Sequence, residues 1–281
     1  MKLLRKGKVK DIYEIDDGKI LFRFSDRVSA FDVRMNEAVP RKGEVLCRFA
    51  EYWFNVLGTN HHMLSVVGKD RMIVKKLNMI PLECIVRGYF YGSLVERYNK
   101  GIGVELFSSD LPPVLATKLN HPMFDPSTKS ETNDVYINNK QIITSGLVSK
   151  QDFDYLKTKS ISLYRSMSTQ VERAGFLLAD VKFEFGKEPK TGNILLGDSL
   201  GPDEYRLWPK KGYSPGKIQE SYDKQLLRDW LIKIGFKDRI DQSKKEGRNP
   251  DPPKLDAALL TKLSNRYIQS YELITRKKID E

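Results

Sequence analysis

Hydrophobic and polar residues alternate along the start of the chain with the two-residue period of a β-strand. The alternation covers residues 9–15, and a second extended run covers residues 19–24. Asp16-Asp17-Gly18 lies between them, and an Asp-Gly pair between two such runs is a strong hairpin signal. The pattern predicts two antiparallel strands joined by a tight turn.

Later segments repeat their apolar residues at intervals of three and four, the spacing of one helix face. We predict helices over residues 44–57, 93–99, 150–174, 223–234 and 255–276. Further strands are expected over residues 71–77, 82–86, 176–185 and 193–196. The proline-rich stretches 103–136 and 197–216 are expected to be irregular, and a long ordered loop such as the first is usually functional. Strand hairpins at the front and helices at the back indicate an α+β fold.

The composition excludes several classes of protein. The chain has 281 residues, of which 40% are hydrophobic, which is enough for a real core. No apolar run approaches the roughly 18–20 residues that cross a bilayer, and the basic N-terminus lacks the apolar stretch of a secretory signal. Cys47 and Cys84 form no disulfide framework, which indicates a reducing compartment. We therefore expect a cytoplasmic protein with no membrane partner.

The net charge is strongly positive, because 48 Lys and Arg residues against 37 Asp and Glu residues give 48 − 37 = +11. Such a surface attracts nucleic acid, acidic membranes or small phosphorylated and carboxylated substrates. The basic residues are spread along the whole chain, and their densest clusters, residues 2–10 and 237–248, contain no nucleic-acid reading module. We expect no nucleic-acid partner; a lysine-rich solvated surface explains most of the charge equally well.

The most informative strand is predicted over residues 178–185. Side chains alternate across a strand, so Asp180, Lys182 and Glu184 share one face and the apolar residues share the other. A hairpin then brings Asp198 toward the base of this charged row. Glu184 and Asp198 are candidate ligands of Mg²⁺, which favours one or two carboxylates together with substrate phosphates. The alternative is a salt-bridged, solvent-facing strand.

Two further groups of basic residues are candidates for phosphate binding. Lys8 and Lys10 point the same way from a predicted strand beside Gly7, although a lysine-protected sheet edge explains them as well. Arg87 and Arg206 offer planar forks for phosphate or carboxylate, with Ser93 near a helix N-terminus, and an arginine that caps a nearby carboxylate is the alternative. No Walker A loop, dinucleotide fingerprint, zinc-ligand spacing or nucleophile elbow occurs in the chain.

Six blocks of sequence, in one order from about residue 5 to residue 275, resemble the SAICAR synthetase family, the phosphoribosylaminoimidazole-succinocarboxamide synthases. The first signature corresponds to Ile80–Arg87 followed by Gly92-Ser93, and the second to Leu178–Gly186. The other four blocks are Gly7–Tyr13, Ser25–Asp32, Pro126–Lys129 and Tyr222–Trp230.

The resemblance implies an ATP-dependent ligase of purine biosynthesis that joins a carboxylated aminoimidazole ribonucleotide (CAIR) to L-aspartate through an acyl phosphate, with Mg²⁺. It also implies a two-lobed SAICAR synthase-like fold with a kinase-like or ATP-grasp-like nucleotide site between the lobes. We expect a smaller, mainly antiparallel β lobe over residues 1–82 that binds ATP. A larger α+β lobe over residues 83–281 would carry the Mg²⁺ and ribonucleotide sites. The sequence does not give the oligomeric state, so a homo-oligomer stays open.

The resemblance assigns roles to individual residues. Candidate catalytic residues are Lys182 and Asp180, and the ATP-binding candidates are Lys8, Lys10, Glu83, Val86 and Lys182. The CAIR-binding candidates are Arg87, Ser93 and Arg206, the aspartate-binding candidates are Ser29, Asp32 and Lys129, and the metal ligands are Glu184 and Asp198.

The chain departs from the family pattern at two places. Tyr91 stands where a small residue is usual, and its bulk is expected to crowd the phosphate loop. Asn133 and Val135 replace a His and a Glu of the usual His-Asp-Glu group, while Asp134 is kept. Two other functions stay open: a small-molecule kinase, which needs no aspartate, and a non-catalytic basic binding protein, which needs no carboxylate pair.

Overall fold

The computed structural model describes residues 1–104, 107, 113–129, 137–248 and 250–280. These residues pack as two compact units. The first unit comprises residues 1–79, 185–204 and 222–281, and the second comprises residues 80–184 and 205–221. This grouping joins two later segments to the first 79 residues. The division into lobes 1–82 and 83–281, with the ligands assigned to each, stays a prediction.

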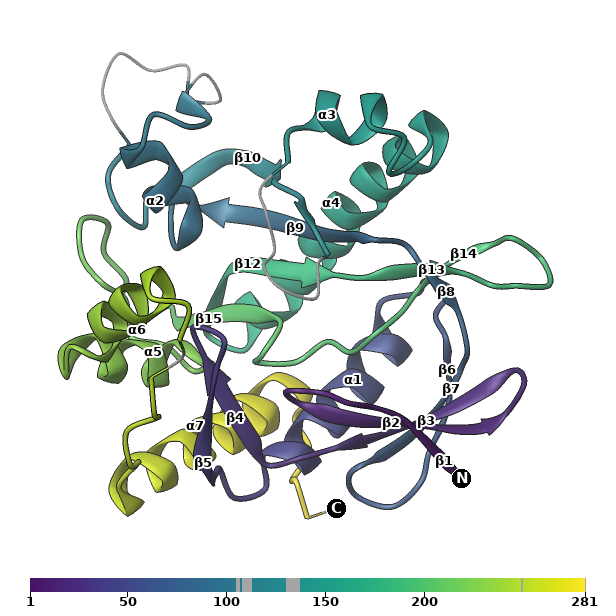
Figure 1. The fold of residues 1–281 in the computed structure, drawn as a ribbon, viewed down its shortest axis with the longest axis horizontal. Coiled ribbons are helices and arrows are strands. Elements are labelled where there is room, and N and C mark those ends of the chain that lie inside the picture. The colour runs from purple at the N-terminus through teal and green to yellow at the C-terminus, as the bar shows by residue number, and fades with distance from the viewer. Residues whose placement is uncertain (105–106, 108–112, 130–136, 249, 281) are drawn as a thin grey trace. The chain divides into compact units, whose positions relative to one another are not determined.

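A five-stranded antiparallel sheet forms one side of the first unit (Figure 1). Its strands, in spatial order, are β1 (Lys2–Lys6), β2 (Lys10–Asp16), β3 (Lys19–Phe24), β7 (Arg71–Lys75) and β6 (Met63–Val66). The predicted hairpin is confirmed, since β2 and β3 pair antiparallel across the Asp-Gly turn. A smaller hairpin follows, formed by β4 (Arg27–Ala30) and β5 (Val33–Ala38).

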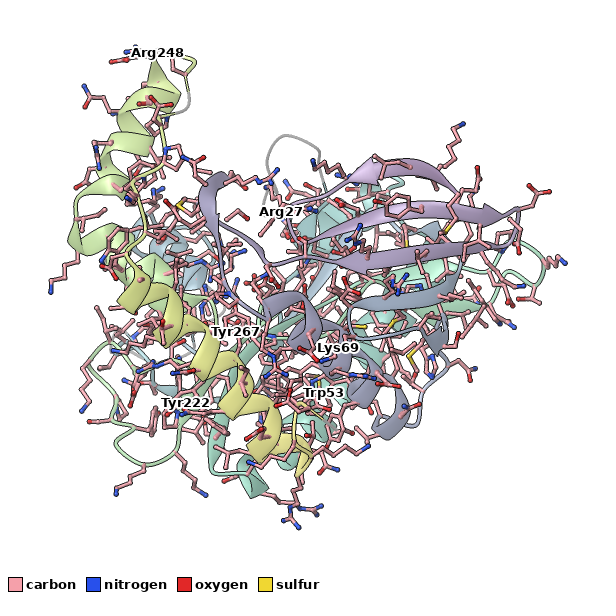
Figure 2. The ribbon with its side chains drawn as sticks, turned by 90° about the horizontal axis from the view of Figure 1, so that it is seen from below. Arg27, Trp53, Lys69, Tyr222, Arg248 and Tyr267 are labelled. Carbon is pink, nitrogen blue, oxygen red and sulfur yellow. The ribbon has the colours of Figure 1, made fainter. Side chains whose placement is uncertain are left out.

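Helix α1 (Lys42–Val56) packs against this sheet and against α7 (Ala257–Thr275). Val45, Phe49 and Trp53, which were predicted to share the apolar face of α1, are fully buried, whereas Val56, predicted on the same face, is exposed. Trp53 on α1 and Tyr267 on α7 are labelled in Figure 2. The unit also contains α5 (Gln225–Lys233), α6 (Phe236–Lys245) and the sheet β14 (Ile194–Leu196), β13 (Phe185–Lys187) and β8 (Asn78–Met79).

The second unit is built on one antiparallel sheet with β9 (Leu82–Tyr89) and β12 (Phe176–Phe183) at its centre (Figure 1). The edge strands are β10 (Lys118–Phe124) and β15 (Tyr205–Pro209), and the short β11 (Ser127–Thr128) also pairs with β9. The unit has three helices in its described part, namely α2 (Ser93–Asn99), α3 (Asn139–Thr144) and α4 (Lys150–Arg173). Helix α4 packs across β12, β9 and β10.

Two expectations about irregular segments were wrong. Strand β10 lies inside the stretch 103–136, and β15 lies inside 197–216. Both are edge strands that contain a proline, Pro122 in β10 and Pro209 at the end of β15. An edge strand accepts proline because one of its sides needs no N–H donor. Among the helices of the described residues, none is long and apolar enough to cross a membrane.

Candidate active site

Strand register in the second unit brings together three charged residues that lie far apart in the sequence. Asp180 on β12 pairs with Arg87 on β9 and with Arg206 on the other neighbouring strand, β15. The Arg206 Nη1 donates to Asp180 Oδ2 at 2.6 Å, and the Arg87 Nη1 donates to the same oxygen at 3.5 Å. Asp180 therefore bridges the two arginines that were predicted to hold a phosphate.

Arg87 also donates to residues outside β12, among them Asp125 and Ser93. The side chain is only 2% exposed, its Nε donates to Asp125, and its Nη2 donates to Ser93 Oγ at 2.9 Å. Arg97 Nη2 donates to the other oxygen of Asp125 at 2.5 Å. Burial acts to raise the pKa of Asp125, but Arg87 and Arg97 outweigh it and hold that pKa below its ordinary value. Arg87, Arg97 and Arg206 thus surround the two carboxylates of Asp125 and Asp180.

Lys182 lies at the centre of a second chain of charges. Its Nζ donates to Glu83 Oε1 at 2.9 Å and to Glu184 Oε1 at 2.5 Å. The Lys129 Nζ donates to the other oxygen of Glu184, and the Ser127 hydroxyl donates to Glu83 Oε2 at 3.0 Å. Strand alternation places the Glu83 and Arg87 side chains on the same face of β9, which is why Glu83 reaches Lys182.

The predicted charged row is salt-bridged, but it does not face solvent. Asp180 is 6% exposed and Glu184, which follows the last residue of β12, is 4% exposed. Burying a carboxylate is costly unless cations compensate its charge, so this face needs the lysines and arginines around it. Such an arrangement is more typical of a site that binds charged ligands than of an ordinary strand surface.

Lys10, a candidate ATP-binding residue of the first unit, makes several contacts through its ammonium group. Its side chain is nearly buried, and its Nζ lies 2.5 Å from Asp198 Oδ1 and 2.7 Å from Ser199 Oγ. The ammonium also lies 4.8 Å from the centre of the Phe22 ring. Lys10 thus pairs directly with one of the two predicted metal ligands. Asp198 has a φ of 55°, a strained value for a residue other than glycine.

His62 fixes the backbone of Asp198. The His62 Nε2 donates to the Asp198 carbonyl oxygen at 2.9 Å. Burial lowers the pKa of His62 to about 4, so its ring is neutral at neutral pH. The sequence shows His62 only as half of a His-His pair without metal-ligand spacing, and nothing in that pattern predicts this role. Asp125 was also missed, although it directly precedes the block Pro126–Lys129.

Lys8 does not share the environment of Lys10, so the expectation that both point the same way from one strand was wrong. Gly7 N–H donates to the Lys10 carbonyl in a tight turn, and β2 begins only at Lys10. A Cβ on Gly7 would lie 2.6 Å from that carbonyl oxygen, so the turn requires glycine. Lys8 is exposed and pairs with Asp32 at 2.7 Å.

The remaining candidates lie in different surroundings. Ser29 is buried on β4, and Asp32 has a φ of 67° in the turn between β4 and β5. Lys129 belongs to the second unit and pairs with Glu184. Val86 is fully buried on the face of β9 opposite to Arg87, the face that also carries Cys84. The ligands assigned to these four residues stay predictions.

Tyr91 is buried in the second unit, and the expectation that its bulk crowds the phosphate loop stays a prediction. Its ring packs edge-on against Trp208, with centroids 4.9 Å apart, in an aromatic cluster of the second unit. The other departures from the family pattern, Asn133 and Val135, lie outside the described residues.

Buried carboxylates interleaved with lysines and arginines on an antiparallel sheet are typical of an α+β protein with a site for charged ligands. A sequence model of one family, SAICAR synthetase, matches residues 3–243. The chain belongs to the SAICAR synthetase family, and it is a ligase.

Similarity to known proteins extends over nearly the whole chain. The phosphoribosylaminoimidazole-succinocarboxamide synthase of Nitrosopumilus maritimus is 47% identical over 279 residues, covering 99% of this chain and all of the relative. A SAICAR synthase from Saccharomyces cerevisiae complexed with SAICAR is 33% identical, with a TM-score of 0.83 over 99% of this chain and 96% of that one. A SAICAR synthetase in complex with ADP is 27% identical, with a TM-score of 0.73 over 98% of each chain.

Proposed function

We propose that this ligase joins CAIR to L-aspartate, with cleavage of ATP, to give SAICAR, ADP and phosphate in de novo purine biosynthesis. The observation that carries the proposal is the match, over 99% of this chain, to a yeast SAICAR synthase complexed with SAICAR. The relative in complex with ADP supports ATP as the co-substrate.

The reaction explains why the site contains cations and carboxylates. A carboxylate does not react with an amine at neutral pH until one of its oxygens becomes a leaving group. Transfer of the γ-phosphoryl group of ATP to the CAIR carboxylate oxygen releases ADP and forms an acyl phosphate. The amine of aspartate then attacks the acyl carbon, phosphate leaves with the C–O electrons, and the nitrogen loses a proton. Such phosphoryl transfer needs mainly positioning and charge neutralisation from the protein.

The chemistry of each candidate side chain indicates which substrate it would bind. Lys182 and Lys10, with Lys8, would neutralise the ATP phosphates, and Glu83 and Val86 would lie near the adenine. Arg87, Ser93 and Arg206 would bind the ribonucleotide phosphate, since guanidinium groups match phosphate oxygens. Ser29, Asp32 and Lys129 are the candidates for aspartate. In this assignment Lys182 and Asp180 are the candidate catalytic residues, and Asp180 also supports the two arginines.

The donor chemistry of Glu184 and Asp198 fits Mg²⁺. Both side chains are carboxylates. Glu184 pairs with Lys129 and Lys182, Asp198 pairs with Lys10, and all three lysines are candidates for substrate binding. The described residues contain no group of three or more His, Cys, Asp and Glu side chains that would hold a metal. Two carboxylates suit Mg²⁺, which usually keeps water and substrate phosphate among its ligands. When bound, the cation supplies further neutralisation of phosphate charge.

The reaction is tested by following ADP and SAICAR with ATP, Mg²⁺ and CAIR, each with and without aspartate. We expect ADP release to require aspartate at steady state and to match SAICAR formation one to one. Sustained ADP release without aspartate, with accumulation of a phosphorylated product, would instead identify a small-molecule kinase. Glu184→Gln and Asp198→Asn should each abolish Mg²⁺-dependent turnover while the circular dichroism spectrum stays unchanged. Turnover like that of the wild type in both variants would remove the metal assignment.

A further inference from the structure

The guanidinium of Arg206 is enclosed by three different groups of the second unit. Asp180 Oδ2 accepts its hydrogen bond at 2.6 Å. The centre of the Tyr91 ring lies 5.9 Å from the Arg206 Cζ. Gly92 closes a third side, because a Cβ built there would lie only 2.9–3.0 Å from the guanidinium atoms. The ring, the glycine backbone and the carboxylate oxygen together limit the orientation of this guanidinium.

The Tyr91 ring is itself held rigidly. Tyr91 is 6% exposed, and its ring packs on Trp208 at 4.9 Å with an interplanar angle of 72°. Its backbone carbonyl accepts a long hydrogen bond, 3.5 Å, from the Arg87 Nη1. Tyr91 therefore contacts both candidate phosphate arginines, Arg206 through its ring and Arg87 through its carbonyl.

We propose that Tyr91 is a positioning residue, whose ring orients Arg206 for the phosphate of the ribonucleotide substrate. The inference rests on the proposed function, in which Arg206 binds that phosphate. An aromatic face attracts a guanidinium and accepts it in a stacked geometry. The Tyr91 ring holds the guanidinium of Arg206 in place before the substrate binds. Loss of the ring therefore weakens substrate binding and leaves the phosphoryl transfer step unaffected.

Steady-state kinetics of Tyr91→Leu and Tyr91→Phe test this role. We expect Tyr91→Leu to raise the KM for CAIR by about fivefold to tenfold, the size of a partly buried cation–π contact, with kcat unchanged. Tyr91→Phe keeps the ring and should retain a KM within about twofold of the wild type, since the contact uses the ring face. A fall in kcat at unchanged KM in Tyr91→Leu, or equal effects of Leu and Phe, would overturn the proposal.

Tyr89 provides a matched control for the packing of the cluster. Its ring also packs on Trp208, with centroids 5.1 Å apart, and it is 4% exposed. Tyr89→Leu should lower the melting temperature about as much as Tyr91→Leu, but it should leave the KM for CAIR unchanged. An equal rise in KM in both variants would show that Tyr91 acts only through the stability of the cluster.

Arg206→Ala separates this inference from the proposed function. We expect Arg206→Ala to raise the KM for CAIR strongly, and Tyr91→Leu to add nothing further in that background. If Arg206→Ala leaves the KM unchanged, the phosphate assignment itself fails. If Arg206→Ala raises the KM and Tyr91→Leu does not, or if Tyr91→Leu has its full effect in both backgrounds, only the role of Tyr91 is overturned.

Discussion

His62 couples the stability of the first unit to pH. The folded protein holds its pKa at about 4, mainly because burial disfavours the charged ring, against 6.5 for an ordinary histidine. Between these values the unfolded chain binds a proton that the folded protein excludes. The free energy of unfolding is therefore expected to fall as the pH decreases from 6.5 toward 4, by about 3 kcal/mol from His62 alone.

A comparison of the wild type with His62→Gln isolates this contribution from the carboxylates that titrate in the same range. Glutamine keeps an N–H donor for the Asp198 carbonyl and does not titrate. We expect the unfolding free energy of His62→Gln, measured by urea denaturation, to depend less steeply on pH than that of the wild type. Parallel curves for the two proteins would contradict the assigned pKa.

The positions of single charged residues were predictable where they follow from the two-residue period of a strand. Asp180, Lys182 and Glu184 were placed together because strand alternation does not depend on tertiary contacts. Their burial was not predictable, since it depends on Lys129, Arg87 and other residues that the sequence places far away. Lys8 was misplaced because it follows a turn at Gly7, and the strand begins only at Lys10.

Strands and helices with a clear hydrophobic period were predicted within a few residues of their observed bounds. Helix α4, predicted over 150–174, spans Lys150–Arg173, and its start is fixed by Ser149, whose hydroxyl accepts from the Asp152 N–H. The edge strands β10 and β15 were not predicted. Their proline and polar residues obscure the sequence pattern that would indicate strands paired with the central ones. Helix α6 was also missed, since its sequence is mostly charged.

The packing of α4 on β9 gives a prediction at the scale of these elements. A Cβ on Gly88 would lie 1.7 Å from the hydroxyl oxygen of Tyr164, a residue of α4. That hydroxyl donates to the Leu178 carbonyl at 2.7 Å. Gly88→Ala must therefore displace the ring and break a buried hydrogen bond. We expect it to lower the free energy of unfolding by about 3 kcal/mol.

Urea denaturation of Gly88→Ala measures this loss, and Gly18→Ala serves as its control. Gly18 lies in the exposed turn between β2 and β3, and the nearest atom to an added Cβ is 3.8 Å away. The control should change stability by less than about 1 kcal/mol. Equal stability of the two variants would show that α4 moves away from β9 at little cost.

At the scale of the whole molecule, the charge of +11 has a consequence for substrate association. ATP, CAIR and aspartate are all anions at neutral pH, and a positive surface raises the rate at which anions arrive. Salt screens this attraction, with a Debye length of about 30 Å at 0.01 M and about 10 Å at 0.1 M. The conversion of bound substrates occurs at short range, where screening by salt is much weaker.

We therefore expect kcat/KM for CAIR to fall by roughly threefold to tenfold between about 10 and 200 mM NaCl, while kcat changes by less than about twofold. Initial rates over a range of CAIR concentrations at fixed Mg²⁺ and saturating ATP measure both constants. Sucrose at equal osmolality controls for effects on water activity, and potassium acetate in place of NaCl controls for specific binding of chloride. A constant kcat/KM would show that the excess lysines belong to a solvated surface with no part in steering.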